Sequence, residues 1–105
     1  MRYEIIVAPS AAGEYRALSA RRRAEVHDAL ETHLRHEPTK VSKSRIKRLR
    51  GLSRPQYRLR VGDIRVFYDV VATEVQVLAI VTKAQAQDWL EQEGVADEGG
   101  RASKG

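Results

Sequence analysis

The feature that most constrains the fold is an alternation of apolar and polar residues over positions 56–71, interrupted by Gly62 and Asp63. A period of two is typical of a β-strand with one buried face. A Gly-Asp pair between two such runs predicts a two-residue hairpin turn. The sequence therefore predicts an antiparallel hairpin with strands at 56–61 and 64–71, in which Val61 faces Ile64.

This register divides the hairpin side chains between two faces. The predicted core face carries Tyr57, Leu59, Val61, Ile64, Val66 and Tyr68. The opposite face carries Phe67 and the arginine trio, by which we mean Arg58, Arg60 and Arg65. Arg60 lies directly opposite Arg65, and like charges in that relation destabilise a sheet. A phosphate that accepts hydrogen bonds from these guanidinium groups would reverse the effect, and Phe67 offers a surface on which a base could stack.

Basic residues are concentrated in one part of the chain. Residues 40–65 hold ten of the 19 Lys and Arg and a single acid, a net charge of +9, whereas the remaining residues carry −4. The members outside the hairpin are Lys40, Lys43, Arg45, Lys47, Arg48, Arg50 and Arg54. Clustered bases favour a polyanion because each phosphate contact releases counterions. We therefore expect this connector to bind nucleic acid.

Three alternatives stay open at this point. The connector could be a solvated loop that only keeps the protein soluble. The trio could be neutralised by Asp69, which lies diagonal to Arg58, and by acids elsewhere in the chain. The groove could also take an acidic segment of a protein.

Capping and periodicity predict the elements before the connector. Residues 3–7 read as a strand, Ser10 is placed to cap a helix to about residue 18, and Ser19 to cap a second helix to about residue 36, before Pro38. The apolar stripe of the second helix is Val26, Ala29, Leu30, His33 and Leu34. Since only Ser19 joins the helices, they should form a helical hairpin.

The remaining elements follow from similar signals. Ile46, Leu49 and Leu52 recur every three residues and predict a loose helical turn that pins the connector, residues 39–55, to the core. Residues 75–82 read as a further strand. Residues 82–85, Thr-Lys-Ala-Gln, match a capping box that opens a last helix to about residue 93, ended by Gly94 and anchored to the sheet by Trp89 and Leu90.

The predicted order is β-α-α-β-β-β-α, an α+β fold. It has an antiparallel sheet, an N-terminal helical hairpin on one face and a short C-terminal helix. We expect a single domain over residues 1–94. Residues 95–105 are small, polar and Gly-rich, which is typical of a disordered tail.

Composition excludes several kinds of protein. There is no cysteine, no apolar run near the roughly 20 residues of a membrane helix and no signal-peptide pattern, so we expect a cytoplasmic protein without a membrane partner. His27, His33 and His36 lack further ligands nearby, and no Gly-rich phosphate loop is present, so no metal or cofactor is expected. An enzyme built on Arg, Lys, Tyr and Asp would suit phosphoryl chemistry on RNA.

The element order, the connector sequence of residues 45–52 (RIKRLRGL) and the hairpin sequence of residues 57–68 (YRLRVGDIRVFY) resemble the RelE/ParE toxin superfamily over roughly residues 3–90. The compact helical hairpin is more similar to the RelE branch. The resemblance implies the toxin of a type II toxin–antitoxin pair. RelE-like members cut mRNA in the ribosomal A site with the substrate 2′-hydroxyl as nucleophile, and ParE-like members inhibit DNA gyrase. Both are neutralised by a small antitoxin, and only the complex represses the operon at its operator DNA.

The resemblance also implies roles for individual residues. Arg58 and Arg60 match two strand lysines of RelE-like toxins, and Arg65 matches the phosphate-binding arginine. The arginine and tyrosine of the family's C-terminal helix correspond to Ala86 and Leu90, so both groups are missing here. The nearest retained base is Lys83.

The missing groups leave few side chains to move a proton. Arginine is not deprotonated in proteins, so the general-base candidates are Lys83, Asp63, Tyr57 and Tyr68, of which the two tyrosines read as core.

Three functions are consistent with this reading. The first is a ribosome-dependent endoribonuclease, an mRNA interferase, in which Arg58, Arg60, Arg65 and Lys83 act on the scissile phosphate. The second is a toxin-fold protein that acts by binding alone, at gyrase or as a decayed toxin that retains antitoxin binding. The third is a nucleic-acid-binding module unrelated to toxins.

Overall fold

The computed structural model describes residues 1–97 and has the α+β architecture predicted from the sequence. In chain order its elements are β1 (Glu4–Val7), α1 (Pro9–Ala17), α2 (Ala20–Ala29), the π-helical turn η1 (Leu30–Leu34), β2 (Ile46–Arg48), β3 (Leu52–Arg54), β4 (Tyr57–Val61), β5 (Ile64–Val71), β6 (Glu74–Thr82), α3 (Lys83–Glu93) and β7 (Val95–Ala96). Five strands form one sheet in the order β1-β6-β5-β4-β2, and β3 pairs with β7.

The central hairpin has the predicted register. Arg60 lies opposite Arg65 and Arg58 opposite Phe67 across the β4–β5 pair. Gly62, at the turn, has a φ of +57°, a left-handed conformation that glycine adopts without steric cost. The alternation and the turn residues together are therefore sufficient to fix this pairing.

The sheet is mixed, which corrects the expectation of a wholly antiparallel one. β1 runs parallel to β6, with Glu4 beside Glu74 and Val7 beside Val77. The other pairs of the large sheet are antiparallel. A short apolar strand satisfies its backbone groups in either direction, so its composition does not specify which one forms.

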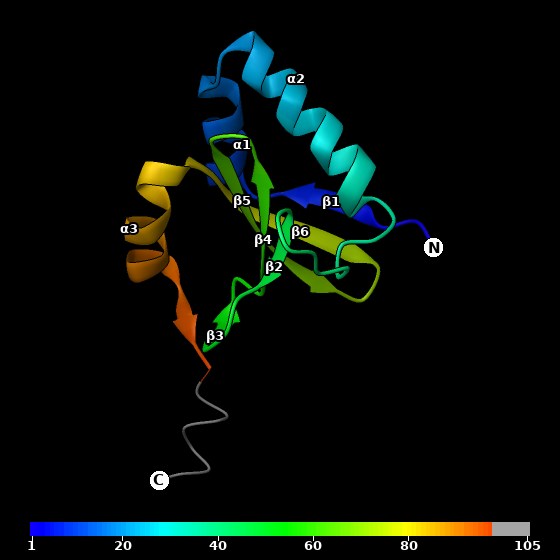
Figure 1. Cartoon of the computed structure of the whole chain (residues 1–105), viewed down its shortest axis with the longest axis vertical. Helices are drawn as coiled ribbons and strands as arrows, with labels where there is room; N and C mark the ends of the chain where they lie inside the picture. Colours follow the sequence, from blue (N-terminus) through cyan, green and yellow to red (C-terminus); the bar gives the residue numbers. More distant parts are fainter. Residues whose placement is uncertain (98–105) are drawn as a thin grey trace, which may run out of the picture.

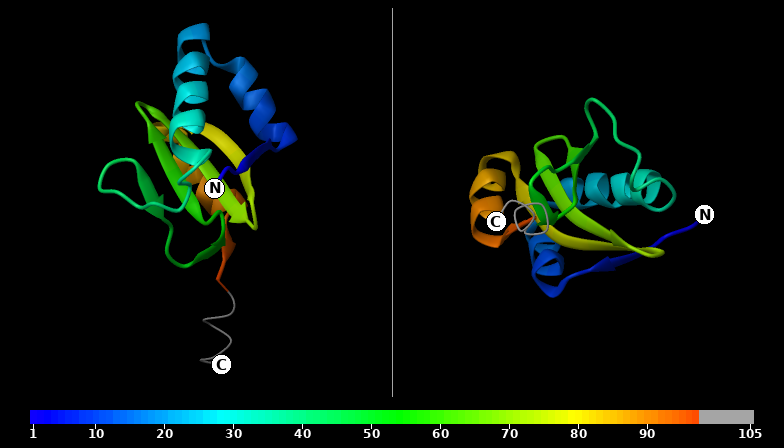
Figure 2. Two further views of the ribbon diagram at one scale, coloured as in Figure 1. Left: turned by 90° about the vertical axis from the view of Figure 1, so that its right-hand side faces the viewer. Right: turned by 90° about the horizontal axis from the view of Figure 1, so that it is seen from below.

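The helices cover opposite faces of the sheet (Figures 1 and 2). α1 and α2 pack on the face that carries Leu59, Val66 and Tyr68, where the main core lies. α3 packs on the other face, where Trp89 and Leu90 contact a smaller cluster, as predicted.

Capping explains where the helices begin. The Ser19 hydroxyl accepts a hydrogen bond from the Arg22 backbone N–H at 3.2 Å, as predicted for α2. Thr82 and Gln85 form the predicted capping box of α3. The prediction that Ser10 caps α1 is wrong: α1 starts at Pro9 after Ala8, because proline fits the first helical turn.

The connector forms strands instead of the predicted helical turn. β2 is an edge strand paired with β4, and buried Ile46 pins it to the core as expected. A threefold recurrence over only seven residues does not distinguish a helical turn from strands separated by a turn.

Part of the segment predicted to be a tail is ordered. Val95 and Ala96 form β7, which pairs with Arg54 and Leu52 of β3. Residues 98–105 of the expected tail lie outside the described residues. Over residues 1–97, no helix is long and apolar enough to cross a membrane.

Candidate functional site

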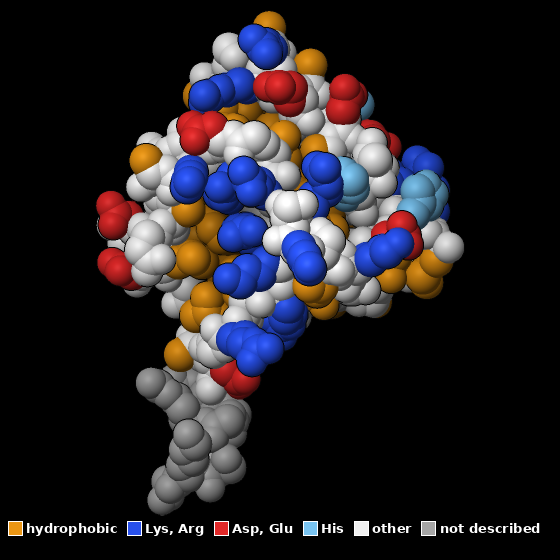
Figure 3. All heavy atoms as spheres, viewed as in Figure 1, with side chains coloured by type: hydrophobic (Ala, Val, Ile, Leu, Met, Phe, Trp, Pro, Cys, Tyr) orange, Lys and Arg blue, Asp and Glu red, His pale blue; other side chains and the backbone are white. Residues whose placement is uncertain are grey.

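Lys and Arg side chains gather on one face of the molecule, over β4 and β2 (Figure 3). Arg58 and Arg60 come from β4 and Arg65 from β5, where period-two alternation directs all three to the face opposite the main core. Lys47 of β2 lies beside Arg58 in the β2–β4 register. The hairpin therefore brings the arginine trio and one lysine together without help from the helices.

The Arg58 guanidinium has an unsatisfied hydrogen-bond donor. Its Nε is buried and has no hydrogen-bond partner among the described residues. Burial first, and then the positive charges of Arg65 and Arg60, lower the pKa of the Arg58 guanidinium below its usual range. Each of these effects disfavours the charged form, and the opposite charge of an anion at this position would offset them.

Arg65 is held in place by the hairpin turn. The residue is 7% exposed, and its Nη1 donates to the backbone oxygens of Gly62 at 2.8 Å and Ile64 at 3.1 Å. Both bonds use the same nitrogen, so Nε and Nη2 are not consumed by the turn. Arg60, directly opposite, is exposed to solvent.

No carboxylate neutralises the trio within residues 1–97, where the ion pairs involve other bases. Asp69, the expected partner of Arg58, instead accepts a hydrogen bond from the Gln56 backbone N–H at 2.8 Å and lies 3.5 Å from Arg54 Nε. Burial raises the pKa of Asp69. The neutralisation alternative is therefore contradicted for this residue.

Lys83 begins α3 close to the same turn. Its backbone N–H donates to the Asp63 carbonyl at 2.8 Å, and its side chain is exposed. The Asp63 carboxylate lies 3.7 Å from Arg22 of α2. The turn at Gly62 and Asp63 thus ties together α2, α3 and Arg65.

The other predicted connector bases have different environments. Arg48 donates to the carbonyls of Leu49 and Gln56 and lies over the Tyr57 ring at 5.3 Å. Arg54 is beside Asp69, and Lys40 lies 3.5 Å from Glu37. The structure therefore gives Arg48, Arg54 and Lys40 partners within the protein and does not bring them to the trio.

Arg45 directly precedes β2, and its backbone carbonyl accepts a hydrogen bond from the Arg60 backbone N–H at 2.8 Å, while its side chain lies near His33. The two residues line one small cavity, and Arg45, after burial, lowers the pKa of His33. Lys43 and Arg50 are exposed. No group of three His, Cys, Asp or Glu side chains in residues 1–97 is placed to hold a metal ion.

No family model and no curated protein matches the sequence. Solved structures do match. The RelE–RelB complex of Pyrococcus horikoshii OT3 is similar with a TM-score of 0.67 and 22% identity, over 81% of this chain and 99% of that chain. The toxin–antitoxin complex RelBE2 of Mycobacterium tuberculosis is similar with a TM-score of 0.62 and 24% identity, over 78% of this chain and 99% of that chain. A double mutant of the E. coli toxin RelE in the free state is similar with a TM-score of 0.66 and 22% identity, over 87% of this chain and 93% of that chain.

The chain has the RelE fold. In this RelE fold, Phe67 does not offer the predicted stacking surface for a base. It is fully buried, and Trp89 of α3 stacks on it with ring centroids 5.0 Å apart and 6° between the planes. The strand alternation predicts only that Phe67 shares a face with the trio, and it does not show that α3 covers this part of the face. The missed signal is β6, whose run Val77–Val81 is apolar on both faces and therefore indicates a strand covered on both sides.

The RelE fold also places the general-base candidates. Tyr57 and Tyr68 stack at 5.4 Å in the main core, the Tyr68 hydroxyl donates to the Pro38 carbonyl at 2.6 Å, and burial raises the pKa of Tyr68. Neither tyrosine is on the trio's face. Ala86 and Leu90 pack against the Phe67 cluster and supply no proton-transfer group.

Proposed function

We propose that this protein is the toxin of a type II toxin–antitoxin pair, and that it inhibits translation by cutting mRNA on the ribosome. The observation that carries the proposal is the unneutralised arginine trio, in which Arg58 keeps a buried Nε without a partner. The similar structures include a toxin–antitoxin complex and a free toxin, which supports the same class of protein for this chain.

A phosphodiester suits the trio in both charge and geometry. Guanidinium groups donate paired hydrogen bonds to phosphate oxygens, and these bonds are stronger than neutral ones. Lys47 of β2 lies beside Arg58 and adds a fourth positive charge to this surface. The ligand class proposed is single-stranded RNA whose scissile phosphate lies on Arg58, Arg60 and Arg65.

Cleavage would use the RNA's own nucleophile. The 2′-oxygen forms a bond to phosphorus, its proton passes to a base, and the bond to the 5′-oxygen breaks as that oxygen takes up a proton. Negative charge grows on the phosphoryl oxygens along this path, so fixed guanidinium groups stabilise the transition state more than the ground state.

Proton transfer is the weak part of this site. Lys83 and Asp63 are the candidates nearest the turn, and Asp63 is already beside Arg22. General acid–base catalysis is worth about 10²–10⁴-fold. We therefore expect slow cleavage that depends on the ribosome to align the RNA.

The second candidate is a toxin-fold protein that acts by binding alone, at DNA gyrase or as a decayed toxin. The observation in its favour is that Ala86 and Leu90 of α3 pack against the Phe67 cluster, at the positions where the resemblance to RelE-like toxins implies an arginine and a tyrosine. In either case the proposed partner is a cognate antitoxin, with operator DNA contacted through the complex. The first candidate adds ribosome and mRNA.

Induced expression with mapping of RNA 5′ ends tests the proposal. Wild-type protein should arrest growth and produce new 5′ ends only on translating messages. The Arg58→Ala/Arg60→Ala/Arg65→Ala variant should do neither, whereas Arg21→Ala, which removes an exposed base of α2 outside the connector and the trio, should behave as wild type. Arrest with intact transcripts would select the binding-only candidate, which gyrase supercoiling then tests.

The third function, a nucleic-acid module unrelated to toxins, predicts a different result. For such a module we expect no growth arrest on expression and no antitoxin gene next to its own. We also expect its binding to RNA or DNA to weaken steeply with salt.

A further inference from the structure

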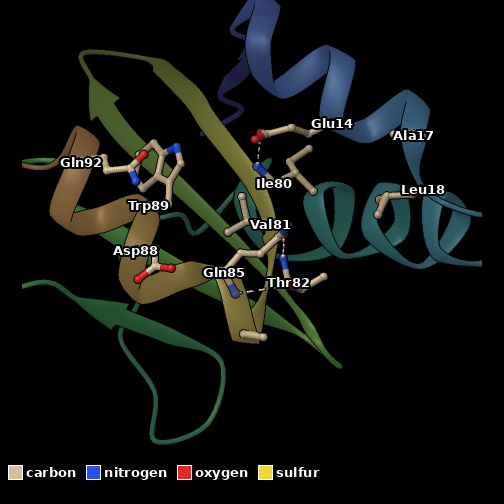
Figure 4. A pocket seen from close by; sticks show the side chains of 11 residues that line it. Glu14, Ala17, Leu18, Ile80, Val81, Thr82, Gln85, Asp88, Trp89 and Gln92 are labelled. Carbon is tan, nitrogen blue, oxygen red and sulfur yellow. Dashed lines mark hydrogen bonds between the residues drawn. The ribbon is translucent and has the colours of Figure 1, made fainter.

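A second concave surface lies away from the trio, between α1 and α3 (Figure 4). It is a groove of about 490 Å³ with the end of β6 as its floor, and we call it the α1–α3 groove. Leu18 from the segment after α1, Ile80 and Val81 from β6 and Trp89 from α3 supply apolar lining. A groove of this size and lining is suited to a few side chains of another molecule.

The floor of the groove is a strand edge that no neighbouring strand of the sheet covers. β1 pairs with β6 only as far as Val77, so the last residues of β6 continue beyond the end of β1. The Ile80 backbone N–H, which points to this side, donates to Glu14 Oε1 at 2.8 Å. A carboxylate on α1 therefore occupies the place that a neighbouring strand's carbonyl would take, and it fixes a negative charge in the groove.

The charge of the groove is opposite to that of the protein as a whole. Glu14 and Asp88 are its ionisable lining residues, and no Lys or Arg lines it. The chain nevertheless carries a net charge of +5. Asp88 is exposed and has no ion-pair partner within residues 1–97. Such a groove repels a phosphate backbone and attracts a cation.

We propose that the α1–α3 groove is a docking site for a peptide segment of a partner protein that carries apolar side chains next to a Lys or Arg. The apolar side chains would lie against Trp89 and Leu18, and the cation would pair with Asp88. Charge complementarity selects this occupant over nucleic acid and over an acidic peptide. No residue of the trio lines the groove, so substitutions can test the two sites separately.

The protein contains its own reporter for this site. Trp89 is the only tryptophan in the sequence and lines the groove, so its emission reports occupation. The probes are three synthetic 12-residue peptides with identical Leu and Ile positions, which carry Arg, Gln or Glu at the same two intervening positions. We expect a saturable emission change with the Arg peptide at the lowest concentration, and the weakest response with the Glu peptide.

Matched charge reversals locate the binding. Asp88→Lys should weaken the binding of the Arg peptide by roughly three- to tenfold, which is the effect expected when one partly exposed ion pair becomes a repulsive pair. Asp28→Lys reverses an exposed acid of α2 outside the groove and should leave the affinity unchanged.

Two results would overturn the proposal. One is the absence of a saturable emission change with the Arg peptide. The other is a lack of charge selectivity: the wild-type protein binds the Arg and Glu peptides equally, or the wild type and Asp88→Lys bind the Arg peptide equally. The trio triple-alanine variant should retain peptide binding. A failure of RNA cleavage would therefore leave this inference intact, and the reverse also holds.

Discussion

Arg58 and Arg35 show how differently two arginines can be used on the same small sheet protein. Arg35 donates to both carboxylate oxygens of Glu31 and to the Tyr3 carbonyl, and its pKa is raised first by the bond to Glu31. Arg58 has a buried Nε with no acceptor and two like charges nearby. Arg35 therefore has a structural role, whereas the environment of Arg58 lacks an acceptor that a bound anion could supply.

The contrast gives a prediction at the residue scale. Arg58→Ala should leave the melting temperature unchanged or higher, because it removes a desolvated charge, while Arg35→Ala should lower it. Arg58→Ala should also weaken the binding of single-stranded RNA by about tenfold or more, which is the effect expected for the loss of one charge-assisted hydrogen bond. Thermal unfolding and fluorescence anisotropy measure the two effects.

A fall in melting temperature for Arg58→Ala as large as that for Arg35→Ala would identify the trio as structural. Unchanged RNA affinity in Arg58→Ala would remove Arg58 from the site.

At the scale of elements, the start of each helix depends on a different device. α2 is capped by the Ser19 hydroxyl, whereas α1 begins at Pro9 and does not use Ser10 as its cap. Loss of a serine cap costs about 0.5–2 kcal/mol. Ser19→Ala should therefore destabilise the protein by about 1 kcal/mol, and Ser10→Ala should have little effect in the same urea unfolding experiment. Equal effects would contradict the capping assignment.

α3 offers a second prediction at this scale. Its surface toward the Phe67 cluster carries Ala86 and Leu90 and no group that could move a proton. If the trio holds a scissile phosphate, Ala86→Arg/Leu90→Tyr should raise the rate of ribosome-dependent cleavage, by up to about 10²–10⁴-fold. The measurement is the rate at which 5′ ends accumulate in a purified translation system.

The same double substitution in the trio triple-alanine background is its control and should give no gain. A gain there would show that cleavage does not need the arginines. No gain in the wild-type background would favour the binding-only candidate.

At the scale of the whole molecule, charge is segregated by surface. The strand pair β4–β5 and edge strand β2 carry the trio and Lys47, whereas the α1–α3 groove carries Glu14 and Asp88. The same fold thus presents one face suited to a polyanion and one groove suited to a cation. An RNA and a protein partner would meet different elements.

The basic face predicts a specific salt dependence. Four bases on four phosphates of a single strand give a slope of about −3 for log K against log salt concentration. The trio triple-alanine variant should reduce the magnitude of that slope by about 2, because three of the four contacts are lost. RNA titrations between 50 and 300 mM salt measure it. An unchanged slope would place the RNA elsewhere on the surface.

How much of the fold and site the sequence predicts depends on how local each feature is. The pairing of Arg60 with Arg65 and the shared face of the trio follow from alternation and from the turn at Gly62, which act over a few residues. The cap at Ser19 and the capping box at Thr82 are equally local. All of these predictions are confirmed.

The features that the sequence missed depend on contacts between distant segments. Phe67 is buried because Trp89, 22 positions later, stacks on it; Asp69 is turned toward Arg54 and Gln56; and β1 runs parallel to β6. Alternation assigns a side chain to a face but does not say what covers that face. The sequence by itself thus determined that three arginines share one side of a hairpin, and packing of α3 and β2 decided what surrounds them, because burial is set by whichever elements meet over a strand.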